Sequence, residues 1–144
     1  TPRPWANAAI AVGFSTTARE LARFGLMIQA GGRWKDQTVI NDTQFLEEML
    51  SPSQQLNPAY GFLWWLNGQE FSVAAGPAAA RREGQLIPSA PPDLVAMQGA
   101  ADRKLYLVPS LNLIVTRLGA SGSQRGSNFN ELFWEALMKA APTP

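Results

Sequence analysis

The residue types that most often carry catalysis are scarce in this sequence. It contains no histidine and no cysteine, which excludes a Ser-His-Asp triad, a thiolate nucleophile and metal sites built on imidazole or thiolate. Each of the three lysines stands three residues after a glycine or an alanine (Lys35, Lys104 and Lys139). A Ser-x-x-Lys pair, whose amine meets the hydroxyl one helical turn away, is therefore absent. No serine has glycine both two residues before and two residues after it, so a nucleophile elbow is absent too.

The carboxylates offer little acid–base chemistry. Glu47 and Glu48 are neighbours on an expected helix and face different directions, whereas Glu131 and Glu135 share one face of a helix that we expect to be solvated. Asp102-Arg103-Lys104 is expected to form a charged, solvated turn beside a strand. No Gly-Lys-Ser or Gly-Lys-Thr sequence is present, which argues against nucleotide binding. We predict no cofactor and no metal.

Composition limits the class of protein further. The chain has 144 residues, enough for a single domain or part of one (1–144), and its net charge of +1 predicts no nucleic-acid partner. No apolar run reaches the roughly 18 residues of a membrane-spanning helix. Trp64 and Trp65 could form a stacking platform, but on a strand they face opposite sides, so we expect at least one in the core.

Three helices are predicted, over 16–30, 43–50 and 127–140. Thr17 and Glu20 have the spacing of a capping box at the first, and Gly31-Gly32 follows its end. The second is expected to begin after Asn41 or Asp42. The third carries one apolar stripe behind a capping Asn128.

The strands are predicted over 60–66, 70–74, 94–98, 103–108 and 113–118. Asn67-Gly68 favours a type I′ hairpin joining the first two. Residues 76–93 contain four prolines and are expected to form a long surface loop. The order of elements predicts an α+β fold, in which one antiparallel sheet has flanking helices and helix 127–140 lies across one face.

Three segments in this order resemble a known family. The sequence GFSTTARELARF at 13–24, YGFLWW at 60–65, and the stretch 99–115, which holds LYLVPSLNLIV, are similar to motifs of the serine β-lactamase-like hydrolases. That family comprises class C β-lactamases, penicillin-binding-protein-like esterases and amide hydrolases. The resemblance extends over nearly the whole chain. It implies the C-terminal portion of a β-lactamase/transpeptidase-like fold.

The resemblance also implies a site. The family's third motif, typically Lys/His-Thr/Ser-Gly on the strand lining the cleft, falls on Met97-Gln98-Gly99, of which only the glycine matches. Gln98 and Gly99 are then expected to bind substrate, and the backbone N–H of Ala100 to contribute to an oxyanion hole. The residues Ala101-Asp102-Arg103 depart from the family's Gly-Gly-Gln.

The nucleophile of this family lies upstream of every segment matched here. The resemblance therefore implies a C-terminal fragment of a hydrolase that cleaves a small ester, amide or lactam through an acyl-enzyme, with this chain inactive alone. Its expected partner is the N-terminal part of the same protein or a swapped copy, covering an exposed apolar surface or strand edge. The family suggests a periplasmic or secreted protein.

A second interpretation stays open from the residues themselves. The chain could be a non-catalytic α+β module that binds a ligand or a protein. The aromatic strand from Tyr60 to Trp65 and the loop 76–93 would then form its binding surface. A Ser-x-x-Lys in the reading frame before Thr1 would distinguish the two interpretations.

Overall fold

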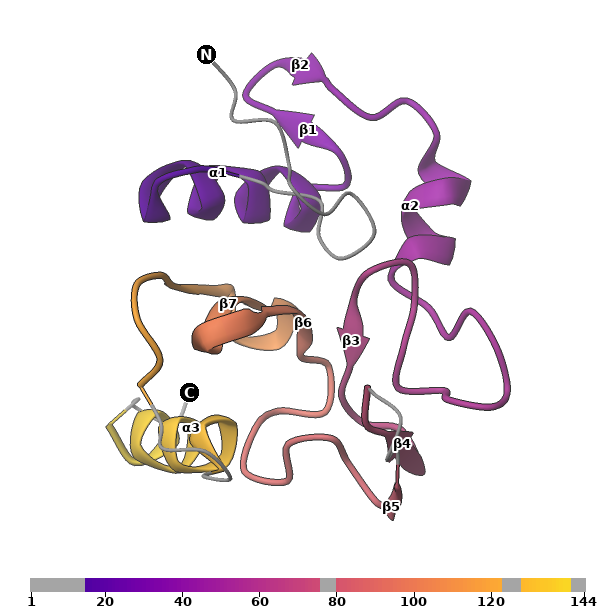
Figure 1. Cartoon of the computed structure of the whole chain (residues 1–144). Helices are drawn as coiled ribbons and strands as arrows, with labels where there is room; N and C mark the ends of the chain where they lie inside the picture. Colours follow the sequence, from indigo (N-terminus) through magenta and orange to yellow (C-terminus); the bar gives the residue numbers. More distant parts are fainter. Residues whose placement is uncertain (1–14, 76–79, 123–127, 141–144) are drawn as a thin grey trace, which may run out of the picture.

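The computed structural model describes residues 15–75, 80–122 and 128–140, and these form an α+β fold as predicted (Figure 1). Its centre is a four-stranded antiparallel sheet in the order β3-β6-β7-β8. The strands are β3 (Trp65–Leu66), β6 (Val95–Gly99), β7 (Arg103–Val108) and β8 (Leu113–Arg117). The last three are hairpin neighbours, close to the predicted ranges.

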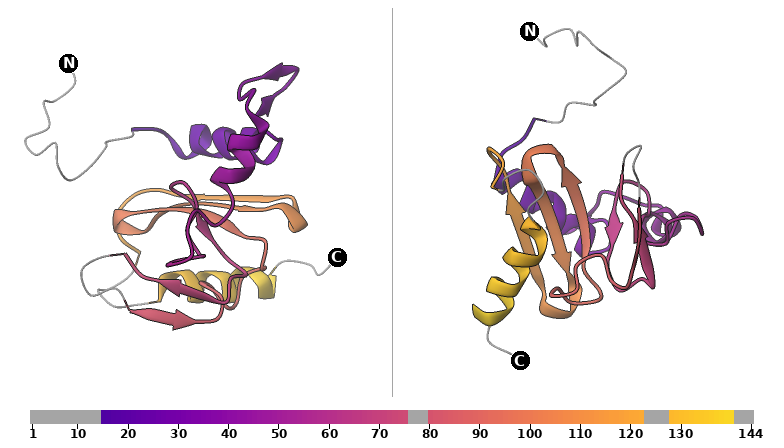
Figure 2. Two further views of the ribbon diagram at one scale, coloured as in Figure 1. Left: turned by 90° about the vertical axis from the view of Figure 1, so that its right-hand side faces the viewer. Right: turned by 60° about the horizontal axis from the view of Figure 1, so that its bottom comes forward.

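One helix covers each face of this sheet, as Figure 2 shows. Helix α1 (Ala18–Gln29) lies on one face, where the side chains of Leu105 and Leu107 on β7 join the core cluster of Trp64 and Ile28. Helix α3 (Phe129–Ala140) lies on the other, where Trp134 packs with Tyr106. The predicted position of the last helix across one face is therefore confirmed. The side chains of β7 alternate between two cores because successive residues of a strand face opposite sides.

The helix ends follow local chemistry. The hydroxyl of Thr17 accepts a hydrogen bond from the backbone N–H of Glu20 at 3.2 Å, which begins α1, and Gly31 follows its end with a φ of 67°. Asp42, one of the two expected caps, accepts from the N–H of Phe45 at 2.9 Å and begins α2 (Thr43–Met49). Between these helices lies a small hairpin of β1 (Arg33–Trp34) and β2 (Gln37–Thr38), which no sequence pattern indicated.

The predicted Asn67-Gly68 hairpin is wrong. Strand β4 (Phe71–Val73) pairs with β5 (Arg81–Glu83) in a separate sheet and does not return along β3. The reason is that the side chain of Asn67 is buried and engaged with the segment 85–91, so it is not at the tip of a hairpin. The five-stranded sheet that we expected is thus a four-stranded sheet beside a two-stranded one.

The loop expected over 76–93 is also more structured than predicted. It contains β5, and its side chains Ile87 and Ala90 are buried in the same core as Tyr106. Residues 76–79 lie outside the described part. The strand expected over 60–66 is shortened by a tight turn, in which the N–H of Gly61 donates to the carbonyl of Trp64 at 2.8 Å.

Large apolar side chains remain on the surface near this turn. Leu63, which has a φ of 66°, is 73% exposed, and Phe62 stacks on Phe45 with ring centroids 6.0 Å apart. None of the described helices is both long enough and apolar enough to cross a membrane.

Candidate functional site

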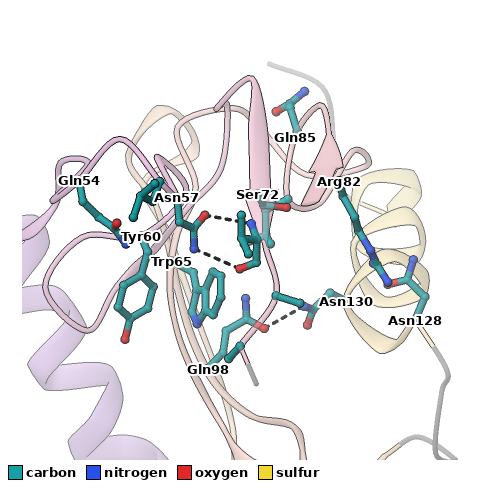
Figure 3. Close-up of a pocket in the computed structure, with 15 residues that line it drawn as sticks. Gln54, Asn57, Tyr60, Trp65, Ser72, Arg82, Gln85, Gln98, Asn128 and Asn130 are labelled. Atoms are coloured by element: carbon teal, nitrogen blue, oxygen red, sulfur yellow. Dashed lines mark hydrogen bonds between the residues drawn. The ribbon is translucent and has the colours of Figure 1, made fainter. Parts of the chain in front are cut away.

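A cavity of about 800 Å³ opens beside the end of strand β6 (Figure 3). Its walls come from the segment 54–60, from β3, from the β4–β5 hairpin and from the first turn of α3. Arg82 is the one charged side chain among the described residues of the lining, which are otherwise amide, aromatic, hydroxyl and aliphatic: Gln54, Leu56, Asn57, Tyr60, Trp65, Ser72, Val73, Ala74, Ala75, Arg82, Gln85, Leu86, Gln98, Asn128 and Asn130. The volume lies in the usual range of small-molecule pockets.

Gln98, predicted from the resemblance to bind substrate, lines this pocket. Its Oε1 accepts hydrogen bonds from Nζ of Lys104 at 2.8 Å and from Nδ2 of Asn130 at 2.9 Å. The Oδ1 of Asn130 in turn accepts from the hydroxyl of Tyr106 at 2.8 Å. A continuous polar chain thus joins the end of β6, the middle of β7 and the start of α3.

Gly99 and Ala100, the other two predicted site residues, do not line this pocket. Both are exposed, at the point where β6 passes into the short helical turn Ala100–Asp102. Gly99 is extended, with φ −110° and ψ 170°, and lies opposite Arg103 in the ladder. The structure therefore separates the side chain of Gln98 from the backbone of the two residues after it.

The turn after Gly99 has an unusual backbone. Ala101 and Asp102 have φ angles of 56° and 55°, in the left-handed region that residues with a Cβ seldom adopt. The guanidinium of Arg117 donates from Nη1 to the carbonyls of Ala101 at 3.2 Å and Asp102 at 3.0 Å. The carboxylate of Asp102 accepts from the hydroxyl of Ser121 at 2.6 Å. These contacts hold the strained turn against β8.

The expectation of a solvated charged turn at residues 102–104 is wrong for Lys104. This side chain is buried, and burial lowers its pKa, with Asp102 acting in the opposite direction. Burial likewise raises the pKa of the Tyr106 hydroxyl. Both shifts arise because removal from water disfavours the charged form of each group.

Two further pairings shape the pocket wall. The ring of Tyr60 meets Trp65 edge to face at 4.9 Å, and Trp65 packs against the core on the α3 side, while Trp64 is buried on the α1 side. The prediction that the two tryptophans face opposite sides is confirmed. Asn57 pairs with the backbone of Val73, accepting from its N–H at 3.0 Å and donating to its carbonyl at 3.1 Å.

The carboxylate pairs do not converge on this pocket. Glu131 accepts through Oε1 from the N–H of Ser89 at 3.1 Å, and its neighbour on the helix, Glu135, is exposed. Within ranges 15–75, 80–122 and 128–140, no group of three or more acidic residues could hold a metal ion. Ser72 also lines the pocket; the residue is 4% exposed, and its hydroxyl makes no hydrogen bond to a described residue.

Sequence reasoning missed Asn57, Arg82 and Asn130. Their partners or pocket neighbours lie far away along the chain, and no local spacing indicates such contacts. No protein-family model, curated protein or solved structure matches the chain.

Proposed function

We propose that this chain is the C-terminal part of a serine β-lactamase-like hydrolase that cleaves a small ester or amide. One observation carries the proposal: Ala101 and Asp102 both have left-handed backbones, with φ angles of 56° and 55°. These are the positions at which the family resembled by this sequence has Gly-Gly. Because glycine adopts this conformation without strain, such a turn is what that family's sequence would favour.

In this proposal the turn presents a hydrogen-bond donor. The N–H of Ala100 would stabilise the oxyanion of a tetrahedral intermediate, together with the N–H of a nucleophilic serine supplied by the N-terminal part of the protein. The exposure of Gly99 and Ala100 supports this role, since the substrate carbonyl needs direct access to that backbone. No lysine stands one helical turn after any serine in this chain, which therefore supplies only half of the site.

The test is covalent labelling of the complete gene product. A fluorophosphonate probe should label one serine upstream of Thr1, located by intact-mass and peptide mass spectrometry. Residues 1–144 alone should take up no probe, because the sequence has no histidine and no serine followed by a lysine one helical turn later. A probe adduct on any serine within 1–144, or an unlabelled complete product, would contradict the proposal.

The pocket supports a second candidate, a small-molecule binding module. Gln98 lines the cavity of about 800 Å³, and reversible binding there requires no nucleophile. Reversible ligand binding by a chain whose complete gene product takes up no probe would favour this candidate.

A further inference from the structure

The orientation of the Gln98 amide is determined by its two partners. Lys104 has hydrogens to donate and no acceptor in its charged form, so the atom of Gln98 that faces it must be the oxygen. The same oxygen accepts from Asn130, which must therefore face Gln98 with its NH₂ group and turn its own oxygen toward the hydroxyl of Tyr106. The charged Lys104 thus fixes the arrangement of both amides, and the Tyr106 hydroxyl, which can donate or accept, is compatible with it.

This arrangement leaves the NH₂ group of Gln98 for the pocket. Nε2 has no hydrogen-bond partner among the described residues, and Figure 3 shows it directed away from Asn130, into the space bounded by Trp65 and Ser72. Because both donors of that group are presented by a fixed amide, the pocket offers a preorganised site for a hydrogen-bond acceptor.

The rest of the lining defines what surrounds that acceptor. Trp65 and Tyr60 form an aromatic wall, and Val73 and Leu86 add aliphatic surface. Among the described residues that line the pocket there is no carboxylate, and the one charged side chain, Arg82, is a cation. A positively charged ligand would meet Arg82 and the buried Lys104 behind Gln98, and would find no partner for its own donors among acidic side chains.

We infer that this pocket binds a small uncharged molecule that places a carbonyl oxygen on Nε2 of Gln98 and an aromatic group against Trp65 and Tyr60. Lys104 is the positioning residue, since it holds the amide in the donating orientation from the core side. The inference goes beyond the proposed hydrolase, because reversible binding requires neither a nucleophile nor the N–H of Ala100.

Two probes of similar size test this polarity on the folded chain. Acetophenone offers a carbonyl acceptor, whereas benzylamine offers a cationic donor at neutral pH. When acetophenone is titrated into the protein, the side-chain NH₂ signal of Gln98 should shift in ¹H–¹⁵N spectra. Acetophenone should bind about tenfold more tightly than benzylamine, given its hydrogen bond and the repulsion of the cation.

Gln98→Glu reverses the polarity of the site with little change of shape. The new carboxylate would pair with Lys104 and present an acceptor to the pocket. The affinity for acetophenone should fall about threefold to tenfold, and the preference over benzylamine should disappear. Gln37→Glu is the matched control, because it makes the same charge change at an exposed residue of β2 that does not line the pocket. It should keep the preference for acetophenone.

Lys104→Met tests positioning. The Gln98 amide would then be free to turn, so the preference for acetophenone should fall while the backbone spectrum stays dispersed, and Lys104→Arg should restore it. Absence of any shift at Gln98 in the folded chain, or equal effects of Gln98→Glu and Gln37→Glu, would overturn the inference. A complete gene product that is labelled by fluorophosphonate but fails these titrations would reject this inference and keep the hydrolase proposal.

Discussion

The side-chain amide of Asn57 pairs with both backbone groups of Val73, accepting from its N–H at 3.0 Å and donating to its carbonyl at 3.1 Å. The Asn57 side chain makes the two hydrogen bonds to Val73 that a residue of a neighbouring strand would otherwise make. It joins the segment before β3 to β4, sixteen residues further along the chain. Asn57 therefore connects two segments that line the pocket.

Asn57→Ala should destabilise the fold by about 1–3 kcal/mol, because the half-buried N–H and carbonyl of Val73 lose their partners. Urea denaturation of the purified variant measures this. Gln54→Ala, at an exposed residue of the same pocket, should change stability by less than about 0.5 kcal/mol. Equal midpoints for the two variants would show that the Asn57 pairing contributes nothing.

Ala101→Gly should stabilise the protein by about 0.5–1 kcal/mol, although glycine usually destabilises. The left-handed backbone of Ala101 strains a residue with a Cβ, and glycine removes that strain. Thermal unfolding should show a raised Tm. Ala100→Gly is the control, because its φ is not positive, and it should leave the Tm unchanged or lower it.

Ala100→Pro should slow acylation of the complete gene product by about 10²–10³-fold, since it removes the proposed oxyanion donor. Proline suits the first position of the turn, and the extended backbone of Gly99 is compatible with a following proline. Labelling rates with the fluorophosphonate measure the effect, and Ala100→Ser, which keeps the N–H, should react at nearly the original rate. An unaffected proline variant would remove Ala100 from the site.

Alkaline pH should act on the fold through Tyr106. Burial raises the pKa of its hydroxyl in the folded state, whereas in the unfolded chain it is about 10. The folded state then binds more protons than the unfolded state above about pH 10, so this stabilisation is complete below that pH and is lost as pH rises further. The free energy of unfolding relative to Tyr106→Phe should fall by up to about 1.4 kcal/mol per pH unit there. A pH-independent difference between the two proteins would contradict the prediction.

Gly25→Val should destabilise the packing of α1 on the sheet by about 1–3 kcal/mol. A Cβ at this glycine would lie 2.9 Å from Cδ2 of Leu107 and 3.0 Å from Cδ1 of Leu105, both in the core. The neighbouring Leu26 is 49% exposed, so Leu26→Val is a control with the same new side chain and a small expected effect. Chemical denaturation compares them, and similar losses for both would argue against close packing at Gly25.

The parts of the fold that sequence predicted well depend on local chemistry. The cap at Thr17 and the glycines after α1 act within a few residues, and β7 and β8 follow one another through a short turn. These signals lie within a few residues of the elements that they specify, so the sequence alone can indicate them.

The hairpin at Asn67-Gly68 failed because two long-range contacts outweigh the local preference. The Nδ2 of Asn67 donates to the carbonyl of Pro91 at 2.9 Å, and a Cβ on Gly68 would lie 2.5 Å from the carbonyl oxygen of Pro92. The Asn67-Gly68 dipeptide therefore packs against Pro91 and Pro92 and does not form a hairpin turn. The pocket could not be predicted from local sequence patterns either. Gln98 was indicated only by resemblance, and its partner Asn130 lies 32 residues away.

The Asn67-Gly68 dipeptide also affects the chemical stability of this protein. A glycine after an asparagine leaves the backbone nitrogen unhindered to attack the side-chain carbonyl, which releases ammonia and forms a cyclic succinimide that water opens to aspartate or isoaspartate. In the folded chain that amide is buried, with its oxygen accepting from the N–H of Ile87 at 2.9 Å, so the attack is blocked. Each excursion to the unfolded state exposes it, and a molecule deamidated there has lost the donor for the carbonyls of Ile87 and Pro91. Chemical damage in this protein should therefore accumulate with the total time that the chain spends unfolded, and each damaged molecule should return to the folded state less readily than before.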